Sequence, residues 1–280
     1  MSQQQKNHTY AYLTITGEGD AQQLIKDHNL KDFEGWNKGE IAEGKYQFDQ
    51  MCIKLNLGEV DFFNTQWLEK IEHQSRKLQQ LPNQLSKTLY VVTHSANMQG
   101  AAFHLSRESI RTLAQNQLAF HLHGYRDSDD GHDFPGAAII QRSEAPARLF
   151  QRAYFSVGSQ THSAQYMLDI LNLQADKSWS IGDYWRTLAN QEIQHRHFSH
   201  ISIASGLPEQ ALLPQHISAL LDKLETRADH IWQLTRDFNI DIGIATTGHM
   251  SNPHHVLISA DTIQRIASFG LSLDMDLYFA

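Results

Sequence analysis

Cysteine and long apolar runs are nearly absent from this sequence. Cys52 is the only cysteine in 280 residues, which excludes an internal disulfide bond. Its mostly apolar strand context predicts a buried thiol and not a nucleophile. No apolar segment approaches the roughly 18 residues that a membrane-spanning helix needs, and the Gln-rich segment Met1–His8 lacks the apolar core of a secretory signal. We therefore expect a cytoplasmic protein without membrane contact.

Positive charge is scarce as well. Lys and Arg number 23 against 31 Asp and Glu, which gives a formal net charge of −8, and no basic stripe stands out. Proteins that bind nucleic acids neutralise phosphates with clustered Lys and Arg side chains, so we expect no nucleic-acid partner. An acidic surface is suited to a basic partner. The hydrophobic fraction of 41% is that of a folded globular protein.

Known catalytic and nucleotide-binding motifs are missing too. Neither the Gly-x-Ser-x-Gly motif of serine hydrolases nor the GxxxxGK[ST] motif of phosphate-binding loops occurs. Gly17-x-Gly19 lacks the third glycine of a dinucleotide-binding fingerprint. Cys52 has no sequence context of a cysteine protease. We therefore predict that the protein is not an enzyme and carries no cofactor.

What the sequence does contain is a repeat of itself. The beginnings of two halves match, since Ala11–Ile15 parallels Ala153–Val157. Their ends match at a constant interval, as shown by the pairs Ser106/Ser259, Ile110/Ile263, Ala114/Ala267 and Tyr125/Tyr278. This pattern indicates a tandem duplication of a module of roughly 120–130 residues. We predict a first module over residues 8–125, a junction over 126–150 and a second module over 151–280.

Each copy is expected to form strand, helix, turn, strand, long helix, strand, helix and strand. Asp20, Ser106 and Ser259 are predicted helix caps, because each precedes an apolar pattern of helical period. Residues 46–57 are predicted to form one strand, 217–234 one long helix, and 137–140 a strand or a crossing segment. The fold class expected is α+β, with each sheet covered by helices on one face. The copies are expected to form an internal pseudo-dimer about a pseudo-two-fold axis, within a monomer or a homodimer.

One turn motif occurs in both copies. Its two versions are Trp36-x-x-Gly39-Glu40 and Trp179-x-x-Gly182-Asp183. Glycine permits a positive φ, and the acidic side chain can accept backbone N–H bonds at the entry to a strand. The tryptophan is either an anchor for a partner or a plug over the end of a sheet.

Histidine is abundant, with 17 residues. On a strand running through residues 195–200, His195 and His197 would share one face. They could hold zinc, copper or nickel if His249, His254 or His255 supplied a third ligand. The alternative is a solvated polar face of a sheet.

The two closing strands differ in charge. Asp274 and Asp276 alternate with apolar residues, so that both carboxylates lie on one face, and the first copy has His121 and His123 at these places. The carboxylates could form an acid/base pair, a cation site or a wet face that opposes edge-to-edge association. If the closing strands meet across the pseudo-two-fold axis, imidazoles would face carboxylates and favour the intramolecular pairing.

These motifs together resemble a bacterial module, the domain-of-unknown-function family 4279. The second copy fits its pattern at Trp179, Gly182, Asp183, Ser259, Leu273, Asp274, Asp276 and Tyr278. The first copy keeps Gly17, Trp36, Gly39, Glu40, Ser106 and Tyr125. The resemblance covers nearly the whole chain and implies a fold but no activity. By analogy of type, small bacterial α+β proteins of this kind often neutralise toxins.

We therefore predict a protein-binding protein, most concretely an immunity-type protein that neutralises a bacterial toxin by direct binding. The alternatives are a metal-binding protein or metal-dependent enzyme that uses the second module, and a scaffolding protein. The candidate interaction residues are Trp36, Glu40, His121, His123, Trp179, Asp183, Asp274 and Asp276.

Overall fold

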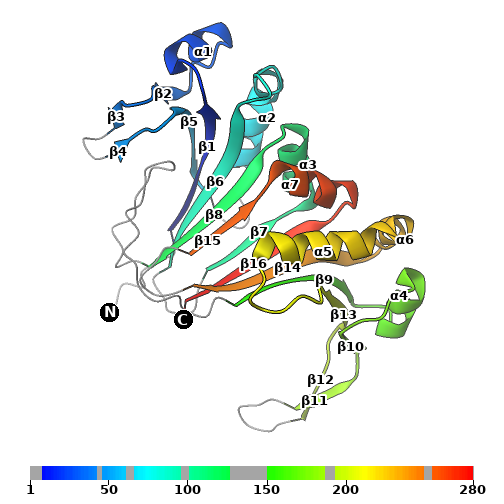
Figure 1. Cartoon of the computed structure of the whole chain (residues 1–280). Helices are drawn as coiled ribbons and strands as arrows, with labels where there is room; N and C mark the ends of the chain where they lie inside the picture. The colour runs from blue at the N-terminus through cyan, green and yellow to red at the C-terminus, as the bar shows by residue number, and fades with distance from the viewer. Residues whose placement is uncertain are drawn as a thin grey trace.

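Two six-stranded sheets and seven helices make up the described part of the chain (Figure 1). The computed structural model describes residues 8–42, 46–60, 66–95, 101–126, 150–186, 193–248 and 254–279. This architecture confirms the predicted α+β class. None of the helices in these residues is long and apolar enough to cross a membrane.

We call the two large sheets sheet 1 and sheet 2. In spatial order, sheet 1 contains β15 (His254–Ile258), β8 (Ala119–Arg126), β6 (Ser86–Ser95), β1 (His8–Gly17), β5 (Met51–Glu59) and β2 (Glu34–Trp36). Sheet 2 contains β7 (Ala101–Leu105), β16 (Ser272–Phe279), β14 (Asn239–Gly248), β9 (Gln151–Ser159), β13 (Ser199–Ala204) and β10 (Lys177–Trp179). Two hairpins extend from the sheets, formed by β3 (Ile41–Ala42) with β4 (Tyr46–Gln47) and by β11 (Tyr184–Arg186) with β12 (Ile193–His195).

The two halves exchange one strand each. β7 belongs to the first half of the chain but pairs with β16, placing Leu105 opposite Leu273. β15 belongs to the second half but pairs with β8, placing Ile258 opposite Phe120. The two sheets have the same strand order, because each strand of sheet 2 has a counterpart at the same place in sheet 1. The pairs β6–β8 and β14–β16 occupy matching places, and both are parallel. This order accords with two related modules, while the duplication and its pseudo-two-fold axis stay predictions.

The helices lie on one side of the sheets. They are α1 (Ala21–Asp27), α2 (Gln66–Gln79), α3 (Arg107–Gln115), α4 (Ala164–Leu171), α5 (Leu213–Glu225), α6 (Ala228–Leu234) and α7 (Ala260–Ser268). In Figure 1, α2, α3, α7 and α5 follow one another, and each contacts the next. The predicted caps are confirmed, because the side chains of Asp20, Ser106 and Ser259 each accept a backbone N–H bond from the first helical turn.

Strand alternation builds one core that is continuous between the halves. On β16, Leu273, Met275 and Leu277 are buried against the helices, while the intervening residues point to the opposite face. Phe103 of β7 packs against Phe120 of β8, with 5.8 Å between ring centroids, and thereby joins the two sheets. Because the exchanged strands carry core residues, neither half encloses its own core.

Two predictions of secondary structure were wrong in detail, and two strands were missed. The strand expected over residues 46–57 is divided into β4 and β5. The long helix expected over residues 217–234 is interrupted between α5 and α6, where the Thr226 hydroxyl donates to the carbonyl of Lys223 and the Arg227 backbone leaves helical geometry. The strands β7 and β15 were not predicted. Residues 137–140 lie outside the described residues.

Candidate functional site

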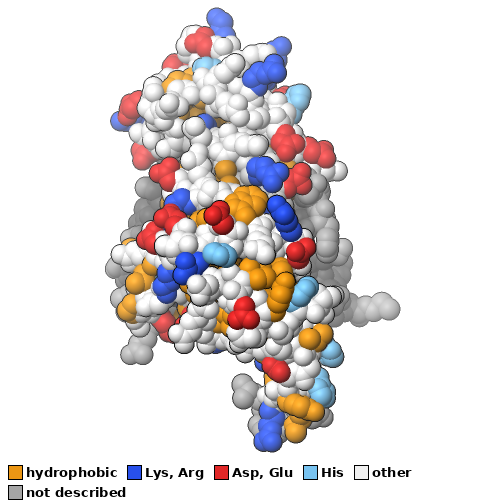
Figure 2. Space-filling view, turned by 90° about the vertical axis from the view of Figure 1, so that its right-hand side faces the viewer, with side chains coloured by type: hydrophobic (Ala, Val, Ile, Leu, Met, Phe, Trp, Pro, Cys, Tyr) orange, Lys and Arg blue, Asp and Glu red, His pale blue; other side chains and the backbone are white. Residues whose placement is uncertain are grey.

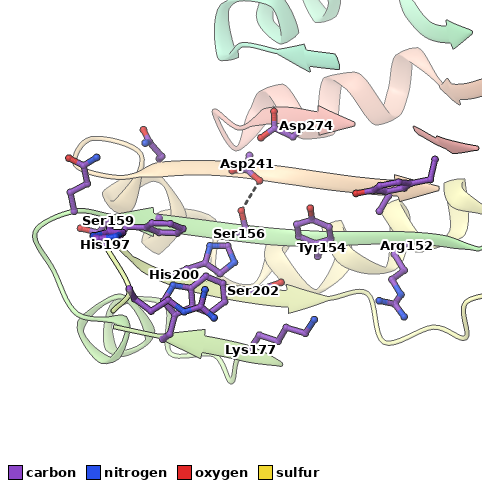
Figure 3. A pocket seen from close by; sticks show the side chains of 18 of the residues that line it. Arg152, Tyr154, Ser156, Ser159, Lys177, His197, His200, Ser202, Asp241 and Asp274 are labelled. Atoms are coloured by element: carbon purple, nitrogen blue, oxygen red, sulfur yellow. Dashed lines mark hydrogen bonds between the residues drawn. The ribbon is translucent and has the colours of Figure 1, made fainter. Parts of the chain in front are cut away.

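The face of sheet 2 opposite the helices is hollowed into a groove of about 1010 Å³ (Figure 3). Its floor follows from alternation along β9, where Phe155 and Val157 point into the core and Tyr154 and Ser156 point into the groove. Acidic side chains enter from β14 and β16, and basic ones come from β9, β10 and the segment after β12. The groove therefore has one acidic and one basic side.

Asp241 lies at the centre of the acidic side. Ser156 donates a hydrogen bond of 2.7 Å to its carboxylate, the dashed line in Figure 3. Burial raises the pKa of Asp241 to about 6, and the charge of Asp274 adds to this, while the Ser156 hydrogen bond and the charge of His104 oppose it. Close to neutral pH this carboxyl group therefore changes its charge.

The exchanged strand β7 contributes to the same site. His104 on β7 is hydrogen-bonded through Nδ1 to the carboxylate of Asp274, its register partner on β16. This hydrogen bond raises the pKa of His104. Asp276 lies two residues further along the same face, and burial and the charge of Asp274 raise its pKa. The acidic side of the groove thus depends on residues from both halves of the chain.

Tyr154 lies flat over β14 at a position without a side chain. A Cβ atom added to Gly243 would stand 2.2 Å from the Tyr154 ring, which is far inside van der Waals contact. Burial, together with the nearby carboxylates, raises the pKa of Tyr154 to about 12. The phenol therefore stays protonated and able to donate a hydrogen bond into the groove.

Substituting Gly243→Ala should therefore destabilise the protein by about 1–3 kcal/mol through overpacking. The cause can be isolated in a double-mutant cycle. In a Tyr154→Ala background the same substitution should cost much less, because the ring that it meets is gone. Chemical denaturation of the four proteins measures this, and an equal cost in both backgrounds would refute the ring contact as the cause.

A stack of aromatic and basic groups forms the opposite side. Trp179 at the end of β10 lies between His200, at 4.4 Å between ring centroids, and the Arg196 guanidinium, at 4.3 Å from the Trp179 centroid. The same guanidinium lies 4.6 Å from the ring of Trp185 on β11. These cation–π contacts tie the β11–β12 hairpin to the edge of the groove.

The hairpin itself exposes hydrophobic side chains. Tyr184 is 74% and Ile193 is 61% exposed. Figure 2 shows hydrophobic and histidine side chains gathered on the protruding lower end of the molecule, where the hairpin lies. Exposed apolar groups gathered on a projection are unusual for a surface that contacts only water.

Both Trp-x-x-Gly-acid turns have the expected local structure. The carboxylates of Glu40 and Asp183 each accept a hydrogen bond from a backbone N–H three residues earlier, at 3.0 and 2.7 Å. The glycines adopt positive φ values of 86° and 88°. The tryptophans differ: Trp36 stacks on Phe48, whereas Trp179 lines the groove. Glu40 and Asp183 thus shape turns, and Trp179 is the member of this motif that the structure places in the candidate site.

The structure does not bring the predicted metal ligands together. The strand expected through residues 195–200 is interrupted after His195, which ends β12 with its ring against Tyr184, while His197 lines the groove. His249 lies outside the described residues, and His255 belongs to sheet 1. Among the described residues, no group of three or more His, Cys, Asp or Glu side chains is arranged to hold a metal ion.

The prediction that the imidazoles of the first closing strand face the carboxylates of the second was also wrong. His121 and His123 lie on β8 in sheet 1, whereas Asp274 and Asp276 lie on β16 in sheet 2. The reason is the strand exchange, which inserts β15 beside β8 and β7 beside β16. An imidazole does meet a carboxylate across the two halves, but it is His104 that meets Asp274.

Asp241, which lines the groove, and His104, which is bonded to Asp274 next to it, were not predicted from the sequence. Asp241 carried a signal that could have been used, since it is a carboxylate inside an alternating strand of isoleucines, Ile240-Asp241-Ile242. His104 carried none, because its strand was not recognised. The buried thiol expected for Cys52 is confirmed, and burial raises its pKa to about 11, which keeps it protonated.

The pH dependence of stability should reveal the burial of Asp241. Its pKa is higher in the folded chain than the ordinary value of 3.8, so the folded state binds more protons and stability falls as pH rises from about 4 to about 6. Asp241→Asn should therefore match the wild type near pH 4 and exceed it by about 1–3 kcal/mol at pH 8. Urea denaturation at both pH values measures this; equal differences at both would contradict it.

Comparison with known proteins identifies a matching family but indicates no activity. Residues 148–280 match the family described as "Domain of unknown function (DUF4279)". The predicted resemblance is therefore confirmed for the C-terminal half, which in this chain is the part that forms most of sheet 2 and donates β15 to sheet 1. No curated protein matches the chain.

Proposed function

We propose that the protein binds another protein through the groove of sheet 2 and the adjoining β11–β12 hairpin. The observation that carries this proposal is the exposure of Tyr184 and Ile193 on a projection that is tied to a groove through Arg196. A small ligand would use the groove alone, whereas exposed apolar side chains beside it suit a larger partner. The hairpin supplies apolar anchors and the groove supplies polar complementarity.

The acidic side chains of the groove indicate which charge the partner's docking surface should carry. Asp241 and Asp274 line the acidic side, with Asp276 beside Asp274 along β16, and His104 is the one basic side chain found hydrogen-bonded to them among the described residues. A Lys or Arg side chain of the partner would be attracted there, in agreement with the net charge of −8. In its most specific form the proposal names a bacterial toxin with a basic docking surface as the partner, so that the protein acts as an immunity protein in the cytoplasm.

The hairpin provides a test with a matched control. Ile193 and Ile41 are almost equally exposed, at 61% and 62%, and lie on the two small hairpins of the two halves. The tagged wild type, Tyr184→Ser/Ile193→Ser and Ile41→Ser would each be used to capture partners from cells of the native host. A partner captured by the wild type should then be produced and its affinity for each variant measured.

The double variant should lose at least about 2 kcal/mol of binding free energy, roughly 30-fold in Kd, while Ile41→Ser should keep wild-type affinity. Asp274→Asn/Asp276→Asn should weaken binding most at low salt, because screening already reduces the attraction at high salt. A partner that binds the hairpin variant as tightly as the wild type would refute the proposed surface.

The toxin form of the proposal has its own readout. Expression of the partner alone should arrest growth, and co-expression of the wild type should restore it, whereas Tyr184→Ser/Ile193→Ser should not. A partner that leaves growth unaffected would refute the immunity role, but it would not refute the proposed binding surface.

A further inference from the structure

Three imidazoles meet on the face of sheet 1 that lies away from the helices. His121 and His123 alternate along β8, so both rings lie on the same face, and His255 of the exchanged strand β15 is the register partner of His123. The ring centroids of His121 and His123 are 4.0 Å apart, and that of His255 lies 5.7 and 5.9 Å from them. The cluster exists only because β15 crosses into sheet 1.

Two of these rings have a ring nitrogen without a partner. The Nε2 atoms of His121 and His123 are buried and have no hydrogen-bond partner in the structure, an arrangement that costs free energy unless something satisfies them. Imidazole nitrogens are common ligands of transition-metal ions, so a metal ion is one partner that would satisfy both atoms.

We propose that His121, His123 and His255 bind one divalent transition-metal ion of the zinc, cobalt, nickel or copper type. Three imidazoles around a tetrahedral ion with metal–nitrogen bonds of about 2.0–2.1 Å have ring centroids roughly 5 Å apart, and the observed separations scatter around that value. All-nitrogen ligands favour these metals over calcium or magnesium, which prefer oxygen.

Side chains have to move for the metal to bind. As the described side chains stand, their donor atoms do not gather round one point. His255 is exposed, so its ring can turn at low cost, whereas His121 and His123 are packed against Tyr90, at 5.0 and 5.6 Å between ring centroids. These two rings, with centroids 4.0 Å apart, have to separate slightly, and most of the movement is expected at His255.

Sheet 2 offers an internal comparison. The places of His121, His123 and His255 are taken there by Asp274, Asp276 and Ala102, as the strand registers show. Ala102 cannot coordinate a metal ion, so the arrangement of three imidazoles, and with it the proposal, belongs to sheet 1 alone.

Cobalt(II) provides a direct test with the full-length chain, because its visible absorption reports tetrahedral coordination. Purified, chelator-treated protein would be titrated with CoCl₂ and then with ZnCl₂ in competition. The wild type should bind one Co²⁺ per chain with an intense visible band that Zn²⁺ removes. His255→Ala removes an exposed ligand without disturbing the core and should weaken Co²⁺ binding by at least about 100-fold.

His195→Ala/His197→Ala is the matched control, since it removes two exposed histidines elsewhere and should leave the titration unchanged. Three results would overturn the proposal. Two of them are a wild type without a tetrahedral cobalt band and a His255→Ala variant that keeps it. Loss of the band in the control variant would overturn it as well, because the site would then lie on the β12 side of the molecule.

Discussion

Expressed alone, residues 148–280 should not form a folded monomer. This segment contains the whole stretch that matches the family, yet it lacks β7, which pairs with β16. Its own strand β15 would lose β8, leaving the buried Val256 and Ile258 without their cover. Each such side chain contributes about 1.5–3 kcal/mol when buried. Together with the lost contact between α3 and α7, this approaches the total stability of a typical domain, about 5–15 kcal/mol.

Dimerisation would give the unpaired strands of the fragment new hydrogen-bonding partners. Because β16 occupies in sheet 2 the place that β8 occupies in sheet 1, two copies of residues 148–280 could exchange β15 with each other. We therefore expect a homodimer or an aggregate, as light scattering after size-exclusion chromatography would show. Co-expression with residues 1–147 should instead give a soluble 1:1 complex. A monomeric fragment with cooperative unfolding would contradict the interlocked fold.

Replacing His121 and His123 by Asp should lower stability strongly. The rings of His121 and His123 are half-buried against Tyr90, with their Nε2 atoms shielded from solvent, and an Asp there would have to bury part of a charge or take up a proton at neutral pH. We expect a loss of about 3–5 kcal/mol for the double variant. For a chain of this size that corresponds to a fall in Tm of roughly 10 °C, measured with a chelator present so that no metal contributes.

His255→Asp serves as the control for this experiment, because it introduces the same carboxylate into the same cluster at an exposed position. Its effect should stay within about 0.5–1 kcal/mol. If the double variant melts at the wild-type temperature, the two imidazoles are not buried as the structure describes.

Local signals in the sequence predicted local structure well. Ser106 and Ser259 cap their helices because a side-chain hydroxyl can satisfy an N–H group only a few residues away, and such a pairing is visible in the sequence. The strand exchange involves pairing over a much longer separation. β7 and β15 are five residues each, and nothing within so short a segment tells which sheet it joins.

The candidate site was predicted only in part for the same reason. Asp274 was chosen from the alternation of its strand and Trp179 from its turn motif, and both line the groove. The raised pKa of Asp241 depends on burial and on Asp274, and the charge of His104 reaches it from the other half of the chain. Such an environment exists only after β7, β9, β14 and β16 have come together. The exposure of Ile193 likewise depends on how far the hairpin projects, which residue type alone does not determine.

The strand exchange also explains how one architecture carries two different chemistries. At matching places sheet 2 presents carboxylates and a groove, whereas sheet 1 presents neutral imidazoles among tyrosines. The face away from the helices contains, in each sheet, one residue delivered by the other half, His104 in sheet 2 and His255 in sheet 1. Both proposed sites therefore require the intact chain.

Disulfide trapping tests the strand exchange most directly. In a Cys52→Ser background, Ala102→Cys would be combined either with Asp276→Cys, its observed register partner on β16, or with His123→Cys, the equivalent position on β8. Register partners on adjacent strands lie within disulfide range. After mild oxidation, the account predicts that the first pair loses both free thiols within a single chain and that the second keeps them. A bond in the second pair and none in the first would show that β7 stays with its own half.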